Sequence, residues 1–333
     1  MGCHGRNATP RGQLCAVAGP WAVPVLLLDT ASLYYRAYFA LPDSLVSPEG
    51  IPVNAVRGTL DTVAAIVSAR GSSPVVACWD DDWRPQWRVD LIPSYKTHRV
   101  AVADTQVEDL AEEDVPDALA PQVDMLRELL PALGIPVVGA PAAEADDVIA
   151  DLVAAYPGSI DIASGDRDLV QLVDHRVTLL FTGGSSASRG GKPWLTLDPE
   201  TALSRFGVPA DHYADLAILR GDPSDGLPGA PGIGDKTAAA LVNAFGDLAA
   251  ILAVAEDPAT GRPMTPGVRR RRQESRDELL AADRVVRLGP QPGRSEIVSA
   301  DLSAQHDGLA LASSWGVEAP ARRLAAALQA VAE

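Results

Sequence analysis

Short apolar runs alternate with amphipathic segments along the first two thirds of the chain. Val23 to Leu28 is an apolar run of strand length that ends on Asp29, and Pro74 to Trp79 is a second that ends on Asp80. Between them, Ala55 to Ala69 repeats apolar residues at helical spacing. Because a strand, a helix and another strand follow one another, the pattern predicts a βαβ unit with an acidic residue at the end of each strand.

The same pattern continues through the middle of the chain. It predicts further helices at Thr30 to Leu41, at Gln122 to Leu133 and from Glu144 onward, and further strands at Ile135 to Val138, Ser159 to Ala163 and Val177 to Phe181. From Leu197 the chain is predicted to be helical to its end, with Val268 to Leu288 as one charged helix. The expected fold class is therefore α/β, with a parallel central sheet flanked by helices and a helical C-terminal domain.

The length of the chain favours more than one domain. A chain of 333 residues is long for a single core, so we expect a main domain and a smaller one. Residues 1–20 are expected to form a disordered tail. Residues 21–205 should form the α/β domain, with an insert at about 81–121, and residues 206–333 the helical domain.

The composition argues against a membrane-spanning protein and against a disulfide-stabilised one. No apolar run reaches the ~18 residues that a membrane span needs, and three cysteines make no disulfide framework. A cytoplasmic protein without membrane association is therefore expected. The net charge of −16 argues against non-specific nucleic-acid binding. Any nucleic-acid role has to rest on local basic patches and bound metal.

Acidic residues concentrate between Pro141 and Val170. Seven carboxylates lie there against one cation, Arg167, namely Glu144, Asp146, Asp147, Asp151, Asp161, Asp166 and Asp168. Several fall at a predicted helix start or just past a strand, and both positions lie at the mouth of an α/β sheet. Such crowded oxygen ligands suit Mg²⁺ or Mn²⁺. A capped helix start and a solvated loop would produce the same pattern, so this stretch alone leaves both interpretations open.

The predicted regularity fails from Asp81 to Pro121. Aromatic and basic residues alternate in DDWRPQWRVDLIPSYKTHR, and residues 101–117 then carry seven acidic residues and no basic one. A stretch of this length without regular structure is typical of a functional lid or a flexible insert. Aromatic residues interleaved with Arg and Lys are used by single-stranded nucleic-acid grooves, although a partly buried surface is an alternative.

A glycine-rich segment, GAPGIGDKT, lies at Gly229 to Thr237. Asp235 separates the last glycine from the lysine, so the spacing of a phosphate-binding P-loop is broken. The segment instead predicts a tight turn between helices, whose backbone N–H groups can bind a nucleic-acid phosphate. An ordinary helix–helix turn is the alternative. The run Arg269 to Arg272 is interpreted as a solvated helix face, with DNA contact as the alternative.

Taken together, these segments resemble the bacterial 5′-3′ exonuclease and flap endonuclease family, whose nuclease is also found at the front of bacterial DNA polymerase I. The first acidic motif of the family is similar to LLLDTASLYYRAYFAL, and the second to WDDDWRPQWR through IPSYKTHR. The later motifs are similar to EADDVIADL, SGDRDLVQL and GDPSDGLPGAPGIGDKTAAALV. The resemblance implies a PIN-like or resolvase-like nuclease core and a helix-three-turn-helix at about 211–252.

The resemblance also implies roles for individual residues. Two divalent cations, Mg²⁺ or Mn²⁺, would be held by Asp29, Asp80, Glu144, Asp146, Asp147, Asp166, Asp168, Asp222 and Asp225. The strand end and the scissile phosphate would be gripped by Tyr35, Arg36, Arg88, Tyr95, Lys96 and Arg99, with Lys96 also catalytic. The turn Gly232-Ile233-Gly234 and Lys236 would clamp duplex DNA, at a motif that in the family often carries a K⁺ ion.

The implied function is metal-dependent 5′-3′ exonuclease and structure-specific flap endonuclease activity in DNA replication or repair. Its substrate would be DNA with 5′ ends or flaps, cleaved by a monomer that has a separate DNA polymerase as a candidate partner. The alternatives are a PIN-type ribonuclease, a catalytically inactive DNA-junction binder and a metal-binding structural protein. The physics agrees with a nuclease, since two metals can activate water and neutralise the leaving oxygen during phosphodiester cleavage.

Overall fold

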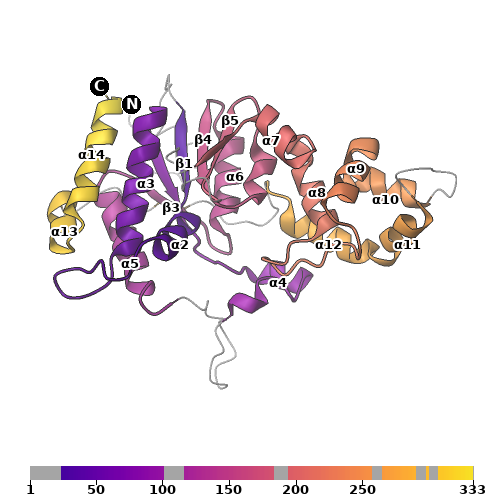
Figure 1. Cartoon of the computed structure of the whole chain (residues 1–333), viewed down its shortest axis with the longest axis horizontal. Helices are drawn as coiled ribbons and strands as arrows, with labels where there is room; N and C mark the ends of the chain where they lie inside the picture. Colours follow the sequence, from indigo (N-terminus) through magenta and orange to yellow (C-terminus); the bar gives the residue numbers. More distant parts are fainter. Residues whose placement is uncertain are drawn as a thin grey trace, which may run out of the picture.

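The computed structural model of the chain describes residues 24–100, 116–183, 194–256, 265–289, 298–299 and 307–332. The predicted tail at 1–20 and most of the acidic segment at 101–117 lie outside these residues. Figure 1 shows a sheet with helices on both faces and a group of helices extending from one side of it.

Seven strands form one sheet, in the order β6 (Leu195–Leu197), β5 (Val177–Phe181), β4 (Ile160–Ser164), β1 (Val25–Asp29), β2 (Val75–Cys78), β3 (Val137–Gly139) and β7 (Val298–Ser299). The five strands from β5 to β3 run parallel, and β6 and β7 are antiparallel at the two edges. The predicted parallel central sheet is therefore confirmed. The edge strands were not predicted, because each has only two or three residues and lies in a segment expected to be a loop or helix.

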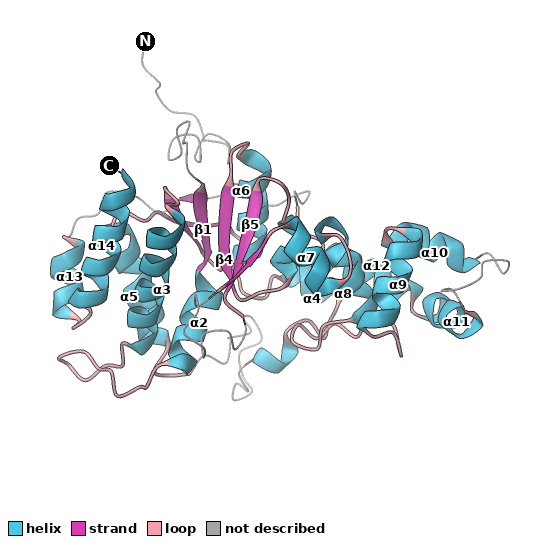
Figure 2. Cartoon of the chain, turned by 45° about the horizontal axis from the view of Figure 1, so that its top comes forward, coloured by secondary structure: helices cyan, strands magenta, loops and turns pink. Residues whose placement is uncertain are grey.

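Two apolar cores cover the two faces of the sheet. Successive residues of β1 alternate between them, so that Leu26 and Leu28 pack into one core and Val25 and Leu27 into the other. The first core lies under α2 (Thr30–Ala40), α3 (Asn54–Arg70), α5 (Ala120–Ala132), α13 (Gly308–Ser314) and α14 (Glu318–Ala332). The second lies under α6 (Ala145–Ala155) and continues into the helical group (Figure 2).

The helical group begins after β6. It consists of α7 (Pro199–Phe206), α8 (Tyr213–Arg220), α9 (Asp235–Phe245), α10 (Leu248–Glu256), α11 (Pro266–Glu274) and α12 (Arg276–Val286). Among the described residues, no helix taken singly is long and apolar enough to cross a membrane. Helices α9 and α10 meet that test only as a pair, and they are bent by 86° at the break between them.

The C-terminal residues correct the expected boundary of the helical domain. Residues 206–333 were predicted to form one helical domain, but β7 pairs with β3 and α14 packs along α3, back on the α/β domain. Leu324 of α14 is completely buried in the core beneath α3. The prediction was wrong because the helical period of a sequence shows that a face is apolar, but does not show which surface that face will cover.

Two other elements also differ from expectation. The irregular stretch at 81–121 contains the short helix α4 (Gln86–Leu91) and the 3₁₀ turn η1 (Thr97–Arg99). The single charged helix predicted at Val268 to Leu288 is two helices, separated at Ser275. One of its arginines, Arg269, donates hydrogen bonds to carbonyl groups at the end of α10, so it is not part of a solvated face.

Leu324→Ala should lower the free energy of unfolding by about 2–5 kcal/mol, because it leaves a cavity between α14 and α3. The same substitution at Leu280, which is 42% exposed on α12, should cost less than about 1 kcal/mol. Urea unfolding followed by circular dichroism measures both. Equal losses would show that α14 does not hold the α/β domain together.

Candidate active site

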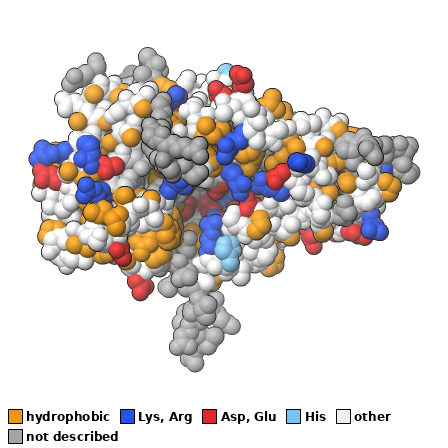
Figure 3. Space-filling model, viewed as in Figure 1, with side chains coloured by type: hydrophobic (Ala, Val, Ile, Leu, Met, Phe, Trp, Pro, Cys, Tyr) orange, Lys and Arg blue, Asp and Glu red, His pale blue; other side chains and the backbone are white. Residues whose placement is uncertain are grey.

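One cavity of about 550 Å³ lies at the carboxyl ends of the parallel strands. Seven of the nine carboxylates predicted to bind metal line it, namely Asp29, Asp80, Glu144, Asp146, Asp166, Asp222 and Asp225. In Figure 3, acidic side chains gather at the bottom of the central hollow, and Lys and Arg side chains lie around it. This is the place where open α/β sheets form their ligand sites.

Asp29 is the last residue of β1 and the N-cap of α2. One of its oxygens accepts a hydrogen bond from the backbone N–H of Ser32 at 3.2 Å, and the other accepts one from the hydroxyl of Ser164 on β4. Burial raises the pKa of Asp29 to about 6, and the negative charge of Asp166 acts in the same direction. Two neighbouring strands thus hold this carboxylate in an environment that favours a bound cation.

Asp80 and Glu144 connect β2 to the start of α6. Asp80 accepts a hydrogen bond from the backbone N–H of Ala145 at 2.5 Å. Burial raises the pKa of Asp80 to about 7, helped by the charge of Glu144. The next carboxyl along α6, that of Asp146, has a pKa well above its usual range because of burial and the charge of Asp147. The start of a helix favours negative charge, but it does not offset this many carboxylates.

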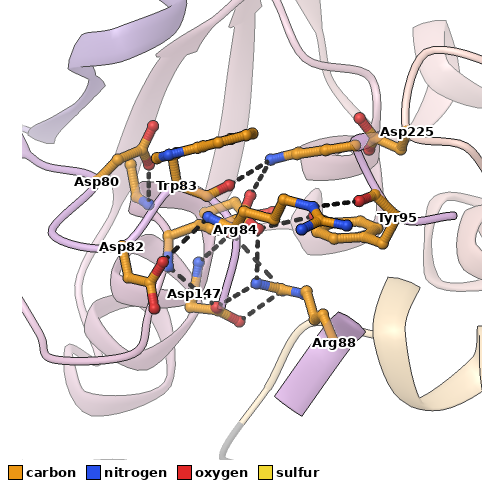
Figure 4. Close-up of polar contacts among 12 residues, drawn as sticks. Asp80, Asp82, Trp83, Arg84, Arg88, Tyr95, Asp147 and Asp225 are labelled. Atoms are coloured by element: carbon orange, nitrogen blue, oxygen red, sulfur yellow. Dashed lines mark hydrogen bonds and ion pairs between the residues drawn. The ribbon is translucent and has the colours of Figure 1, made fainter. Parts of the chain in front are cut away.

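Arg88 of α4 fills the space behind Glu144. Its guanidinium donates to both oxygens of Asp147, at 2.8 and 3.0 Å, and lies 3.2 Å from the near oxygen of Glu144 (Figure 4). Arg88 is only 1% exposed, so the structure does not support the predicted contact with DNA. Asp147 does not line the cavity, and its pairing with Arg88 argues against the predicted metal role. A sequence motif shows which residue types are present, but it does not show which side chains, such as those of Arg88 and Asp147, are buried in the protein.

Tyr95 and Lys96 hold the other side of Glu144. The hydroxyl of Tyr95 donates to one oxygen of Glu144 at 2.8 Å, and the ammonium of Lys96 donates to the other. Burial by itself would raise the pKa of Glu144, but Lys96 and Arg88 outweigh it and the pKa is lowered. Tyr95 is buried and its hydroxyl is engaged, so the structure does not support the predicted DNA contact. Lys96 lines the cavity as predicted.

Asp166 and Asp168 follow β4. The backbone N–H of Asp166 donates to the Ser164 hydroxyl at 2.8 Å, and that of Asp168 donates to the carboxylate of Asp166 at the same distance. Asp168 begins the turn η2 (Asp168–Leu172) and does not itself line the cavity. Burial and the charge of Asp166 nevertheless raise its pKa well above the usual range, so it belongs to the same crowded electrostatic environment.

The remaining two carboxylates come from the helical group. Asp222 and Asp225 lie on the loop that follows α8, and each has a cation beside it. Arg167 approaches Asp222 to 3.5 Å and Arg99 approaches Asp225 to 3.1 Å. The backbone N–H of Lys96 also donates to the Asp225 carbonyl at 3.0 Å. The helical group therefore completes the cavity of the α/β domain.

The charge balance of the cavity favours divalent cations. Seven carboxylates line it against three Lys and Arg side chains, Lys96, Arg99 and Arg167, which leaves a formal excess of four negative charges. Two divalent ions carry that charge. Within the described residues, no three acidic, His or Cys side chains lie close enough together to chelate one ion by themselves. A cavity with many carboxylates, but no three of the described ones around one point, fits Mg²⁺. This ion is commonly held by one or two carboxylates with water and substrate phosphate oxygens.

Apart from the buried Arg88 and Tyr95, the residues predicted to contact DNA fall into three groups. Tyr35, Lys96 and Arg99 line the cavity, and Arg36 is exposed on α2. At the start of α9, Gly232, Gly234 and Lys236 are exposed, whereas Ile233 is buried and anchors the turn. Gly232 has a φ of +68°, which its lack of a side chain permits. Gly234 is in extended backbone, and a Cβ there would meet no atom within 4 Å.

Several site residues were not identified from the sequence, among them Ser32, Ser164 and Arg220. Ser32 and Ser164 fix Asp29 and the chain after β4, since the Ser32 hydroxyl accepts from the Gly165 N–H at 2.7 Å and the Ser164 hydroxyl reaches Asp29. Arg220 lies 3.6 Å from Asp222 and 3.3 Å from Asp235, and so joins the loop to the start of α9. The available signals were the serines flanking the acidic motifs and the arginine directly before Gly221.

Comparison with known proteins identifies the family. The family model for the N-terminal resolvase-like domain of 5′-3′ exonucleases matches residues 24–207, and that for their C-terminal SAM fold matches residues 208–292. The chain belongs to the 5′-3′ exonuclease family. The 5′-3′ exonuclease fold therefore accounts for both the sheet and most of the helical group.

Relatives within the 5′-3′ exonuclease family are similar over most of this chain. A 5′-3′ exonuclease of Streptomyces coelicolor is 48% identical over 92% of this chain and its own full length. One of Mycobacterium tuberculosis is 43% identical over 92% of this chain and 98% of its own. The DNA polymerase I of Mycobacterium bovis is 35% identical over 68% of this chain, which corresponds to 24% of the polymerase.

Solved structures share the fold of this 5′-3′ exonuclease family member at low sequence identity. The flap endonuclease of bacteriophage T5, in a complex with DNA and metal ions, is 16% identical over 93% of this chain and all of its own, with a TM-score of 0.57. The catalytic core of Rad2 in complex with DNA substrate is 16% identical over 98% of this chain and 96% of its own, with a TM-score of 0.53.

Arg88→Met should lower the free energy of unfolding by about 3–5 kcal/mol, because it leaves the buried carboxylate of Asp147 without its cation. Arg167→Met removes a half-exposed arginine at the cavity rim and should cost less than about 1 kcal/mol. Urea titration in chelator measures both variants. If Arg88→Met is as stable as Arg167→Met, the arginine does not serve the structural role assigned here.

Proposed function

We propose that the chain is a metal-dependent 5′-3′ exonuclease and structure-specific flap endonuclease that hydrolyses DNA phosphodiester bonds. The observation that carries this proposal is a single cavity in which seven carboxylates and Lys96 meet, in a chain of the 5′-3′ exonuclease family. We propose that Mg²⁺ or Mn²⁺ is the physiological metal and that DNA with a 5′ end or flap is the substrate.

Within this proposal, the chain supplies the ligands and the positioning. Asp29, Asp80, Glu144, Asp146, Asp166, Asp168, Asp222 and Asp225 are proposed to serve the two cations together, with water and phosphate oxygens as further ligands. When bound, the two cations would activate the attacking water and neutralise the leaving oxygen. The ammonium of Lys96 would stabilise negative charge on the phosphate oxygens, since it lies in the same cavity as the carboxylates.

Duplex DNA is proposed to bind at the turn before α9. The turn presents backbone N–H groups, and Lys236 is exposed in the first turn of the helix, so both phosphate contact and charge are available there. A K⁺ ion at this turn, a separate DNA polymerase as partner and a monomeric state are further parts of the proposal. The first strand residues after the duplex would then pass Tyr35 and Arg99 on the cavity wall.

The two alternative functions, a PIN-type ribonuclease and an inactive DNA-junction binder, would each require only some of these residues. A PIN-type ribonuclease would need the carboxylates but not the Gly232-Ile233-Gly234 turn with the flanking Asp222 and Asp225. An inactive junction binder would need the turn but not a crowded acidic cavity. This chain places Asp222 and Asp225 in the cavity and joins their loop to Lys96 by a hydrogen bond of 3.0 Å, which favours an active nuclease acting on duplex-containing DNA.

Cleavage of a labelled flap duplex should require Mg²⁺ or Mn²⁺ and stop in excess chelator. Asp166→Ala should reduce single-turnover cleavage by several orders of magnitude, because a two-metal mechanism loses one ion. In chelator, the variant should bind the flap duplex as well as the wild type or better, because one repelling charge is gone. Asp124→Ala, an exposed acid on α5 outside the cavity, is the matched control and should cleave normally. Undiminished cleavage by Asp166→Ala would refute the assigned site.

Gly234→Val should weaken binding to duplex DNA by about tenfold while leaving the melting temperature nearly unchanged. The extended backbone and open space at Gly234 accept a side chain, but that side chain would block the approach of a phosphate to the turn. Ala244→Val, at an exposed position near the other end of α9, should leave both quantities unaltered. Fluorescence anisotropy and thermal melting provide the two readouts, and equal DNA affinity in all three proteins would argue against the duplex site.

A further inference from the structure

Lys96 has a fixed backbone and a buried ammonium. Its φ of +47° lies in the left-handed region, and its backbone N–H donates to the Asp225 carbonyl at 3.0 Å. The ammonium donates to the Glu144 carboxylate and to the Trp83 carbonyl at 3.3 Å, and it lies 5.2 Å from the centre of the Tyr95 ring. Only the side chain of Lys96 is therefore able to change its position without breaking the backbone connection to the helical group.

The three cations of the cavity differ in depth. The side chains of Arg99 and Arg167 are 39% and 47% exposed and pair with Asp225 and Asp222. The side chain of Lys96 is 10% exposed, and its partner Glu144 is 5% exposed. The Glu144 oxygen that faces Lys96 is one that a divalent cation would use under the proposed function. The lysine thus supplies positive charge at the bottom of the cavity, where the excess of carboxylates needs it most.

We propose that the ammonium of Lys96 holds the place of a divalent cation on Glu144 and exchanges with that cation when metal binds. This inference rests on the proposed function and adds an order of events to it. A divalent ion and an ammonium repel each other strongly at contact distance, so they do not share one carboxylate oxygen. Metal binding therefore releases the ammonium into the cavity, where the substrate phosphate is proposed to lie.

The exchange serves two purposes. Without metal, Lys96 and Arg88 together neutralise Glu144, which keeps the buried acidic end of α6 stable. With metal, the freed ammonium is available for the phosphate while its backbone stays tied to Asp225. Metal and lysine compete for one ligand, so removing the charge of Lys96 should strengthen metal binding.

Isothermal titration of the full chain with Mn²⁺, in the absence of DNA, tests the exchange. Lys96→Met should bind Mn²⁺ about tenfold more tightly than the wild type. Lys96→Gln, which keeps a hydrogen-bond donor without the charge, should change in the same direction and serves if the methionine variant does not fold. Lys96→Arg keeps the charge and should bind within about twofold of the wild type. Circular dichroism in chelator checks the fold of each protein.

Arg127→Met is the control for the net charge of the protein. Arg127 is exposed, pairs with Asp81 at 2.9 Å and does not line the cavity, so its loss should change the Mn²⁺ affinity by less than about twofold. Folded Lys96→Met and Lys96→Gln proteins with the affinity of the wild type, or a weaker one, would overturn the exchange and leave the proposed function intact. Failure of the wild type to bind Mn²⁺ would instead refute the metal site of the proposed function.

Discussion

The structure depends on the repulsion among carboxylates gathered in one cavity. Burial and mutual repulsion raise the pKa values of Asp29, Asp80 and Asp225 to between about 6 and about 7, which shows how poorly the protein alone solvates these groups. The surrounding elements offset part of the cost: serine hydroxyls hold Asp29, and the buried Arg88 holds Asp147. The cost that these residues do not offset would be relieved by bound cations, so it contributes to the free energy of cation binding.

The need to hold these carboxylates in place also connects the α/β domain with the helical group. Arg88 of α4 reaches the acidic start of α6 and also donates to the Val285 carbonyl of α12 at 3.4 Å. The loop that carries Asp225 accepts from the Lys96 backbone, and Ser94 donates to the Gly226 carbonyl on that loop at 2.8 Å. The cavity is therefore complete only when the helical group is docked, so the proposed duplex site at the start of α9 and the carboxylate cavity at the sheet belong to one connected framework.

Much of this arrangement could be predicted from the sequence, because strand-end acids and a parallel sheet jointly determine where side chains meet. Asp29 and Asp80 illustrate this, since short apolar runs place both at the carboxyl ends of parallel strands. The role of Arg88 could not be predicted, because an arginine in a basic and aromatic stretch has the same sequence signal whether it faces DNA or a buried carboxylate. The return of α14 to α3 was missed for a similar reason: an apolar helical face does not specify its partner.

The net charge of the chain says little about its affinity for DNA. Acidic side chains are concentrated where metal ions are proposed to bind, while Arg99, Arg167 and Lys236 lie at the rim of the cavity or at the start of α9. At physiological salt, charges farther apart than about 8 Å are largely screened, so a phosphate at the turn interacts mainly with its basic neighbours. Two divalent ions in the cavity would cancel its formal excess of four negative charges and so remove the strongest local repulsion of a phosphate. Under the proposed function, divalent cations on these carboxylates would therefore let a protein with a net charge of −16 bind a polyanion.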